Sequence, residues 1–267
     1  MNNENKFKDL IPLIIDNRFK ETLPGLKKFI QERKTMGLVL NDIFNNSDIK
    51  RIRICTGFFS PHVWKLIGDS FETLPISTEQ PTFELLLGSE VKEKSKKDFQ
   101  EWFNEQIRLE LDEFELDIEL QRHIRSLISF LERDDVYIGI QKRPFVHGKM
   151  YCFDEVAIVG SSNFTYHGFT SNTELNIPVF DKKQIMALSY WFDYHFKKAN
   201  TSYKGILIEA LKNCKLGTTE WSPFNVYMKV LYEAYKPTLS FEELATDMEI
   251  KLTVYQQEGV QRLIQAI

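Results

Sequence analysis

The stretch VHGKMYCFDEVAIVGSSN, residues 146–163, decides how this chain is expected to fold. Residues 146–153 and 156–159 are largely apolar or aromatic, and the pair Asp154-Glu155 between them is typical of a turn. Two such runs joined by a short polar turn predict a tight β-hairpin. The hairpin fixes which polar side chains can meet.

Four polar residues lie where this hairpin should bring them together. Side chains at positions i and i+2 share one face of a strand, so His147 and Lys149 are expected to point the same way. Ser161 and Asn163 follow the second strand at the same offset. An imidazole is partly neutral near pH 7 and can attack phosphorus, while an ammonium and neutral donors hold the other phosphate oxygens. The group therefore predicts an attack on a phosphodiester, and this scheme uses no metal ion.

The same residues resemble the signature of the phospholipase D superfamily, which is His-x-Lys-x4-Asp, then Gly-Ser-x-Asn, then a more distant Glu. Five residues separate Asp154 from Gly160, where the family usually has six, so the turn is expected to be one residue shorter. By this resemblance, a carboxylate at Glu174 hydrogen-bonds the nucleophilic imidazole and fixes its tautomer. Asp154 is interpreted as a structural turn residue, and Ser162 is an alternative to Ser161. The predicted catalytic residues are His147, Lys149, Asn163, Glu174 and Ser161.

The rest of the chain predicts an α/β fold, in which a phospholipase D-like layered sheet is flanked by helices and followed by a helical C-terminal extension. Strands are expected where apolar residues alternate or cluster, and helices where they recur with helical spacing. The expected strands are 51–56, 83–88, 136–141 and 174–180. Helices are expected from Ser60-Pro61 onward and within 96–133 and 182–199, after an amphipathic N-terminal region that runs to about residue 46. The motif-bearing domain is placed at residues 1–200.

Residues 201–267 are interpreted as a helical linker and the start of a helicase domain. Helices are expected at 204–214 and 223–235. The segment 252–260 resembles the beginning of superfamily 2 helicases, where a Tyr-Gln pair, here Tyr255-Gln256, precedes the first nucleotide-binding strand. This resemblance implies that the natural chain continues into a motor that binds ATP, although an amphipathic helix after a Thr cap fits the same letters.

Composition limits the classes of protein that fit. The net charge of −4 argues against broad adhesion to nucleic acid, but it leaves room for one local basic cleft. No apolar run reaches 18 residues and the first six residues do not form a signal peptide, so no membrane contact is expected. Three widely spaced cysteines fit reduced thiols in the cytoplasm.

Three functions remain, and a nuclease acting on DNA, with RNA possible, is favoured. Such a domain joined to a DNA motor fits bacterial restriction or defence. A phospholipid-processing enzyme is the second reading, but those enzymes usually carry two motif copies and this chain has one. The third is a catalytically inactive nucleic-acid-binding module. Because the chemistry needs two imidazoles, we expect a homodimer with the two His147 side chains facing each other, and no cofactor at the nuclease site.

Overall fold

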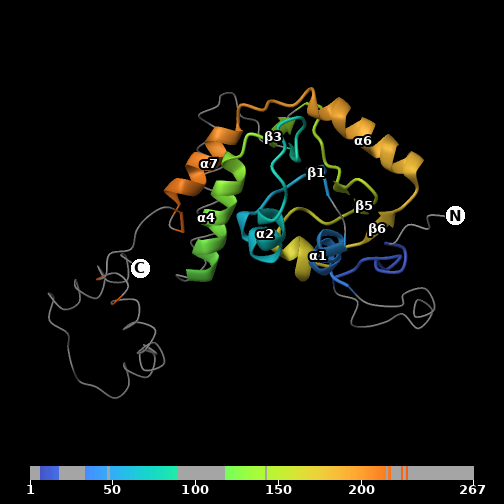
Figure 1. Cartoon of the computed structure of the whole chain (residues 1–267), viewed down its shortest axis with the longest axis horizontal. Helices are drawn as coiled ribbons and strands as arrows, with labels where there is room; N and C mark the ends of the chain where they lie inside the picture. The colour runs from blue at the N-terminus through green and yellow to red at the C-terminus, as the bar shows by residue number, and fades with distance from the viewer. Residues whose placement is uncertain are drawn as a thin grey trace, which may run out of the picture. The chain divides into compact units, whose positions relative to one another are not determined.

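A computed structural model of the protein describes residues 7–17, 34–46, 49–88, 118–141, 143–214, 216–217, 224 and 227. Its centre is a mixed six-stranded sheet with the strand order β3-β2-β1-β4-β5-β6 (Figure 1). The strands are β1 (Ile52–Thr56), β2 (Phe83–Gly88), β3 (Val136–Gln141), β4 (Met150–Cys152), β5 (Ala157–Gly160) and β6 (Asn176–Val179). Strands β1, β2 and β3 are mutually parallel, whereas β4, β5 and β6 pair antiparallel.

Helices cover both faces of the sheet. They are α1 (Met36–Asn46), the 3-10 helix η2 (Pro61–Val63), α2 (Trp64–Glu72), α4 (Ile118–Glu132), α5 (Tyr166–Thr170), α6 (Lys182–Phe196) and α7 (Lys204–Asn213). Parallel strands need a crossover connection, which η2 and α2 supply between β1 and β2, and α4 lies between β2 and β3. The predicted α/β fold of a sheet flanked by helices is confirmed.

Alternating side chains explain why both faces are covered. On β1, Ile52 and Ile54 join the larger apolar core with α1, α2 and α4, while Cys55 points into a second, smaller core. That smaller core is closed by Ile185 and Phe192 of α6, which lies on the opposite side of the sheet from α1, α2 and α4 (Figure 1). Burial on both faces is what the parallel strands β1, β2 and β3 require.

Helix α6 is tied to the sheet by charges as well as by its apolar side. Arg51, just before β1, and Arg53 of β1 approach the Asp193 carboxylate at 3.4 and 3.2 Å. Arg51 also approaches Glu84 of β2 at 2.6 Å. Burial raises the pKa of the Glu84 carboxyl, although the neighbouring Arg51 opposes that effect. This network fixes the position of α6 over the strands that carry the site.

Most of the expected elements are present with shifted ends. The predicted strand at 174–180 is β6, residues 176–179, and the predicted helices at 182–199 and 204–214 are α6 and α7. The prediction for 96–133 is met by α4 from residue 118, and residues 96–117 lie outside the described residues. Residues 252–260 also lie outside them, and so does most of 223–235.

One expectation about the hairpin was wrong. The first strand begins at Met150 rather than near residue 146, so His147 and Lys149 precede β4 instead of lying within it. The ladder ends there because β5 also ends, with the Gly160 amide donating to the Lys149 carbonyl at 3.2 Å. His147 and Lys149 therefore lie on the loop that precedes β4, at the open end of the hairpin.

The chain forms two compact units, residues 1–219 and 220–267. Within the first unit α7 packs on α4, and its Leu207 and Leu211 belong to the larger core. The functional division of the chain at residue 200 stays a prediction. None of the helices in the described ranges is long and apolar enough to cross a membrane.

Candidate active site

The predicted site residues gather at one end of the sheet, where four strands begin or end. Cys55, near the carboxyl end of β1, pairs with Met150 at the start of β4, and Met150 pairs in turn with Val159 of β5. Gly160 at the end of β5 pairs with Asn176 at the start of β6. This register brings the loops at 147–149, 161–163 and 174–175 together.

His147 and Lys149 contact each other directly through their side chains. Lys149 Nζ lies 2.7 Å from His147 Nε2, and it also donates to the His147 carbonyl at 3.0 Å. An ammonium has donors only, so this contact requires His147 Nε2 to be unprotonated. In this contact the Nε2 lone pair of His147 faces the Lys149 ammonium.

Lys149 is a buried cation, with only 7% of its surface exposed. Burial lowers the pKa of its ammonium, and the neighbouring Cys55 and Glu174 partly offset that effect. Cys55 itself is a neutral thiol near pH 7, because burial raises its pKa to about 12 despite the nearby Lys149. The site therefore holds a buried lysine directly beside the His147 imidazole.

Asn163 approaches the imidazole from the other side, across Gly57. A Cβ placed on Gly57 would lie 3.0 Å from His147 Cδ2 and 3.5 Å from Asn163 Oδ1. A side chain here would press on the imidazole, which would have to shift by a few tenths of an ångström. The two predicted residues thus border one small space at the end of β1.

Thr56 is a site residue that the sequence interpretation missed. Its hydroxyl donates to the Phe58 carbonyl at 2.8 Å, accepts from the Phe164 amide at 3.0 Å and lies 3.3 Å from Asn163 Oδ1. Thr56 is fully buried, so it holds the Asn163 loop against the end of β1. Its position at the end of a buried strand, just before Gly57, was the available signal.

Glu174 has a different partner from the one that the family resemblance implies. Its carboxylate accepts a hydrogen bond from the Ser161 hydroxyl, and the Asn172 amide lies 3.5 Å away. No hydrogen bond joins Glu174 to His147, both of which lie in the described ranges. The role of Glu174 in fixing the imidazole tautomer stays a prediction, and in this structure Lys149 contacts Nε2 instead.

The geometry distinguishes between the two serines. Ser162 is fully buried, and Asn176 brackets it by donating to its hydroxyl at 2.8 Å and accepting from its amide at 3.2 Å. Ser161 is exposed, accepts from the Leu175 amide at 2.9 Å and donates to Glu174. Ser161 is therefore the serine that can face a ligand, while Ser162 and Asn176 join the two loops.

Asp154 has the structural role that was expected of it. Its exposed carboxylate accepts from the Lys50 amide at 2.7 Å, which ties the hairpin turn to the start of β1. The other histidines also have partners outside the motif. These partners are Tyr166 for His62, Glu119 for His123, Ser171 for His167 and Gln141 for His195.

Comparison with known families gives a match over the motif region. Residues 85–196 match the family described as "Cardiolipin synthase, PLD-like domain". This match supports the resemblance to the phospholipase D superfamily. The matched range contains all five predicted catalytic residues, whereas Thr56 and Gly57 precede it. No curated protein matches the chain.

Solved structures resemble the domain only distantly. Nuc from Salmonella typhimurium, a phospholipase D family member, is 12% identical over 59% of this chain and 84% of its own, with a TM-score of 0.37. NucT from Helicobacter pylori is 12% identical over 70% and 96%, with a TM-score of 0.39. The phosphatidylserine synthase of Haemophilus influenzae Rd KW20 is 12% identical over 79% and 46%, with a TM-score of 0.42. These likenesses carry no argument about the substrate.

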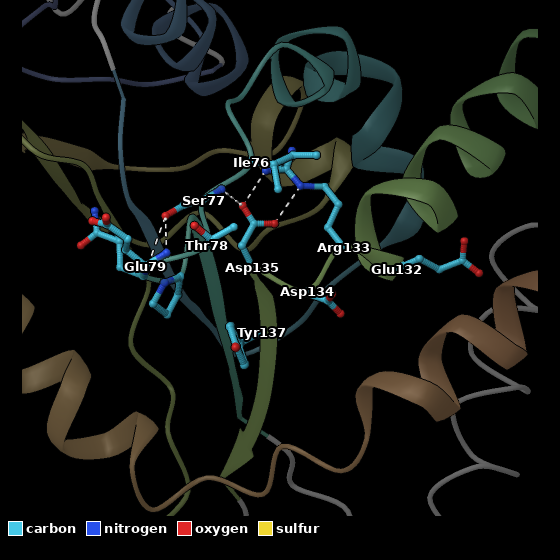
Figure 2. Close-up of a pocket in the computed structure, with 11 residues that line it drawn as sticks. Ile76, Ser77, Thr78, Glu79, Glu132, Arg133, Asp134, Asp135 and Tyr137 are labelled. Carbon is cyan, nitrogen blue, oxygen red and sulfur yellow. Dashed lines mark hydrogen bonds and ion pairs between the residues drawn. The ribbon is translucent and has the colours of Figure 1, made fainter.

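A cavity of about 570 Å³ lies away from these residues, at the amino ends of β2 and β3 (Figure 2). It is lined by residues 76–81, 132–135 and Tyr137. Burial acts to raise the pKa of Asp135, but hydrogen bonds from Arg133, Thr82 and the Ser77 amide outweigh it and hold the pKa well below its usual range. Asp135 is thus a fixed structural anion, and the cavity has none of the predicted catalytic groups.

Proposed function

We propose that this protein is a metal-independent phosphodiesterase that cuts DNA through a phosphohistidine intermediate. The phospholipase D-like domain supports a phosphodiesterase, and the 2.7 Å contact between Lys149 Nζ and His147 Nε2 carries the proposal further. In our proposal this contact places a neutral imidazole, the nucleophile, directly beside a buried ammonium. A phosphate entering beside them would draw the ammonium to its oxygens and free the Nε2 lone pair.

The proposed reaction has two displacement steps. His147 Nε2 attacks phosphorus, a P–N bond forms, and the P–O bond to the leaving nucleoside oxygen breaks. A protonated second imidazole gives its proton to that oxygen. The same imidazole, now neutral, takes a proton from water, whose oxygen attacks phosphorus and breaks the P–N bond. Lys149, Asn163 and Ser161 would hold the non-bridging oxygens as charge develops on them.

We place the second imidazole on a second copy of the chain. The two imidazoles must begin in opposite protonation states, one neutral and one protonated. The other four histidines have partners elsewhere. His195 is followed by Lys197 two positions on, but these residues lie at the end of helix α6, where positions two apart do not share a face, and His195 Nδ1 lies 3.1 Å from Gln141 Oε1. A twofold dimer in which each copy contributes His147 meets the requirement with one motif per chain.

The first test of this function is cleavage without metal ions. Purified protein incubated with labelled DNA in excess EDTA should cut at a rate close to that with added magnesium, because imidazole and ammonium groups perform both steps. Among the described residues, no three His, Cys, Asp or Glu side chains gather as a metal site. Metal independence itself stays a prediction.

Each possible result of this assay has a distinct meaning. Strict dependence on magnesium would contradict the proposed chemistry. DNA binding without cleavage would indicate an inactive binding module, and cleavage of phospholipid vesicles but not of DNA would indicate a lipid enzyme. A parallel incubation with RNA decides between the two nucleic acids.

The shared site is tested by mixing subunits. Wild type and His147→Ala, exchanged in equal amounts, should give roughly a quarter of the wild-type activity per total dimer, because random pairing leaves that share as pure wild-type dimers. Independent sites would instead leave about half. That outcome, or a monomeric mass for the fully active protein, would overturn the shared site.

We also propose that the domain acts as the nuclease part of a helicase-nuclease in bacterial restriction or defence, in the cytoplasm. The support is the helicase-like segment 252–260, which lies outside the described residues. In such a protein ATP would bind to the motor and not to the nuclease site. Cleavage that becomes dependent on ATP in a longer natural chain is the expected sign of this coupling.

A further inference from the structure

Three exposed aromatic rings lie around the His147 site, each on a different segment. Phe58 follows the end of β1, Phe145 lies two residues before His147, and Trp191 lies on α6. Their exposed fractions are 41%, 37% and 40%, respectively. Large apolar side chains are usually buried, so three half-exposed rings beside one polar site indicate a ligand that covers them.

Phe145 is held beside the nucleophile by the end of β2. Its ring lies 5.6 Å from the His147 ring between centroids, with 31° between the two planes. A Cβ placed on Gly88 would lie 3.1 Å from Phe145 Cε2 and 1.8 Å from the Val146 carbonyl oxygen, so this loop can approach β2 only over a glycine. The end of β2 therefore supports one side of the Phe145 ring, while part of the ring surface faces solvent.

Trp191 and Phe58 border the same site from two other directions. A Cβ placed on Gly148, between His147 and Lys149, would lie 3.3 Å from Trp191 Cη2. The neighbouring Asp193 is bound by Arg51 and Arg53, which fixes this part of α6. The backbone carbonyl of Phe58 accepts from the Thr56 hydroxyl, which lies 3.3 Å from Asn163 Oδ1, so residue 58 adjoins the Asn163 side of the site.

The chemistry of such rings favours unpaired bases. Every nucleobase has a π-face that can stack on an aromatic side chain, but inside a duplex the bases already stack on one another. A phosphate site surrounded by aromatic rings can hold the backbone on its cation while adjacent bases stack on the rings. The exposed Arg143, in the same loop as Phe145, adds positive charge for a polyanionic chain.

We propose that the site takes single-stranded DNA, and that bases flanking the cut phosphate stack on Phe145, with Phe58 and Trp191 as further stacking surfaces. This inference rests on the proposed nuclease function and names its substrate class. A base pair must open before its nucleotide can occupy the site. Duplex DNA is consequently a poor substrate unless a partner or a motor unwinds it.

The test compares three labelled substrates of equal length: a single strand, the same strand annealed to its complement, and a chain in which the central nucleotides lack bases. Wild type should cut the single strand with the highest kcat/KM. Phe145→Ala should lower kcat/KM on the single strand roughly fivefold to hundredfold, because one stacking contact is lost. Its loss on the abasic chain should be clearly smaller, and Phe145→Trp should restore cleavage of the single strand.

Tyr137→Ala is the matched control. Tyr137 is 41% exposed, like Phe58, but it lies in the cavity at the amino ends of β2 and β3 (Figure 2). It pairs with Glu84, four residues before Gly88 on β2, which corresponds to roughly 13 Å along the strand. Removing this ring should leave cleavage of all three substrates unchanged. Thermal unfolding of each variant shows whether a loss of activity reflects a loss of folding.

The outcomes separate this inference from the proposed function. Two results would overturn stacking but leave the nuclease proposal intact. Either wild type cuts the duplex as well as the single strand, or Phe145→Ala lowers kcat/KM equally on the normal and the abasic chains. If Phe145→Ala does not fold, stacking is tested instead by the kcat/KM of Phe58→Ala on the same substrates and by the preference of wild type among them. If no nucleic acid is cut but choline phospholipid vesicles are, both the nuclease and the stacking fail together.

Discussion

His147→Ala should lower DNA cleavage by at least roughly 10⁴-fold while leaving folding and DNA binding nearly intact. Loss of a covalent nucleophile removes the reaction path itself, so the remaining groups can only bind the substrate. His147 is exposed and precedes β4, so its truncation leaves no cavity in either core. The measurements are single-turnover cleavage, DNA affinity and the free energy of unfolding.

His167→Ala is the matched control for this prediction. His167 is also exposed, and its Nδ1 bonds the Ser171 hydroxyl at 2.8 Å rather than any group of the motif. It should cut DNA as wild type does. A His147→Ala protein that retains more than a tenth of the wild-type rate would show that another residue is the nucleophile.

The sheet was predictable because its strands carry simple patterns. Residues 83–88 are apolar except for Glu84 and end in glycine, and residues 51–56 alternate charged and apolar side chains before a buried end. Both became central parallel strands that bury side chains on both faces. The local sequence pattern was sufficient to predict these strands, because a strand that is buried on both faces needs apolar side chains along most of its length.

The start of β4 was not predictable in the same way. The apolar residues near 146 continue the strand pattern, but the ladder ends where its partners β1 and β5 end. Strand length here is a property of pairing between distant segments, and a single stretch does not record it. The predicted side-by-side placement of His147 and Lys149 nevertheless holds, through the 2.7 Å contact of their side chains.

The groups that connect the site were missed for a related reason. Thr56 precedes Asn163 by 107 positions, and its hydroxyl joins the two segments only once β1 and β5 lie in one sheet. Trp191 reaches Gly148 only because α6 folds back over the sheet. The motif indicated the chemistry, whereas the surrounding contacts depend on the complete strand order.

Lys149→Met should cost several orders of magnitude in cleavage without lowering the stability of the fold. Removing one fixed donor from a developing oxyanion typically costs about 10²–10³-fold, and Lys149 also supplies the buried positive charge that faces the phosphate. Lys212→Met is the control of equal charge change, since that lysine pairs with Glu132 on the surface. More than a tenth of wild-type cleavage in Lys149→Met would contradict the assignment.

The stability prediction follows from the direction of the pKa shift. Burial lowers the pKa of Lys149 in the folded protein, so between that value and the ordinary lysine pKa the folded state binds fewer protons than the unfolded state. The charged ammonium therefore costs stability below the folded pKa, and the cost fades as pH rises through this window. Urea unfolding should show Lys149→Met at least as stable as wild type at neutral pH, with the difference narrowing at alkaline pH.

The same shift predicts the alkaline limit of the wild-type enzyme. The pH profile of kcat/KM reports groups of the free enzyme, so deprotonation of Lys149 should add an alkaline decline at a pH below the ordinary lysine pKa, beyond the decline caused by the proposed acidic imidazole. Lys149→Arg keeps its charge throughout this range, and any cleavage that it retains should lack this decline. An unchanged alkaline decline in Lys149→Arg would show that a different group titrates, and that the buried ammonium is not the cation on which cleavage depends.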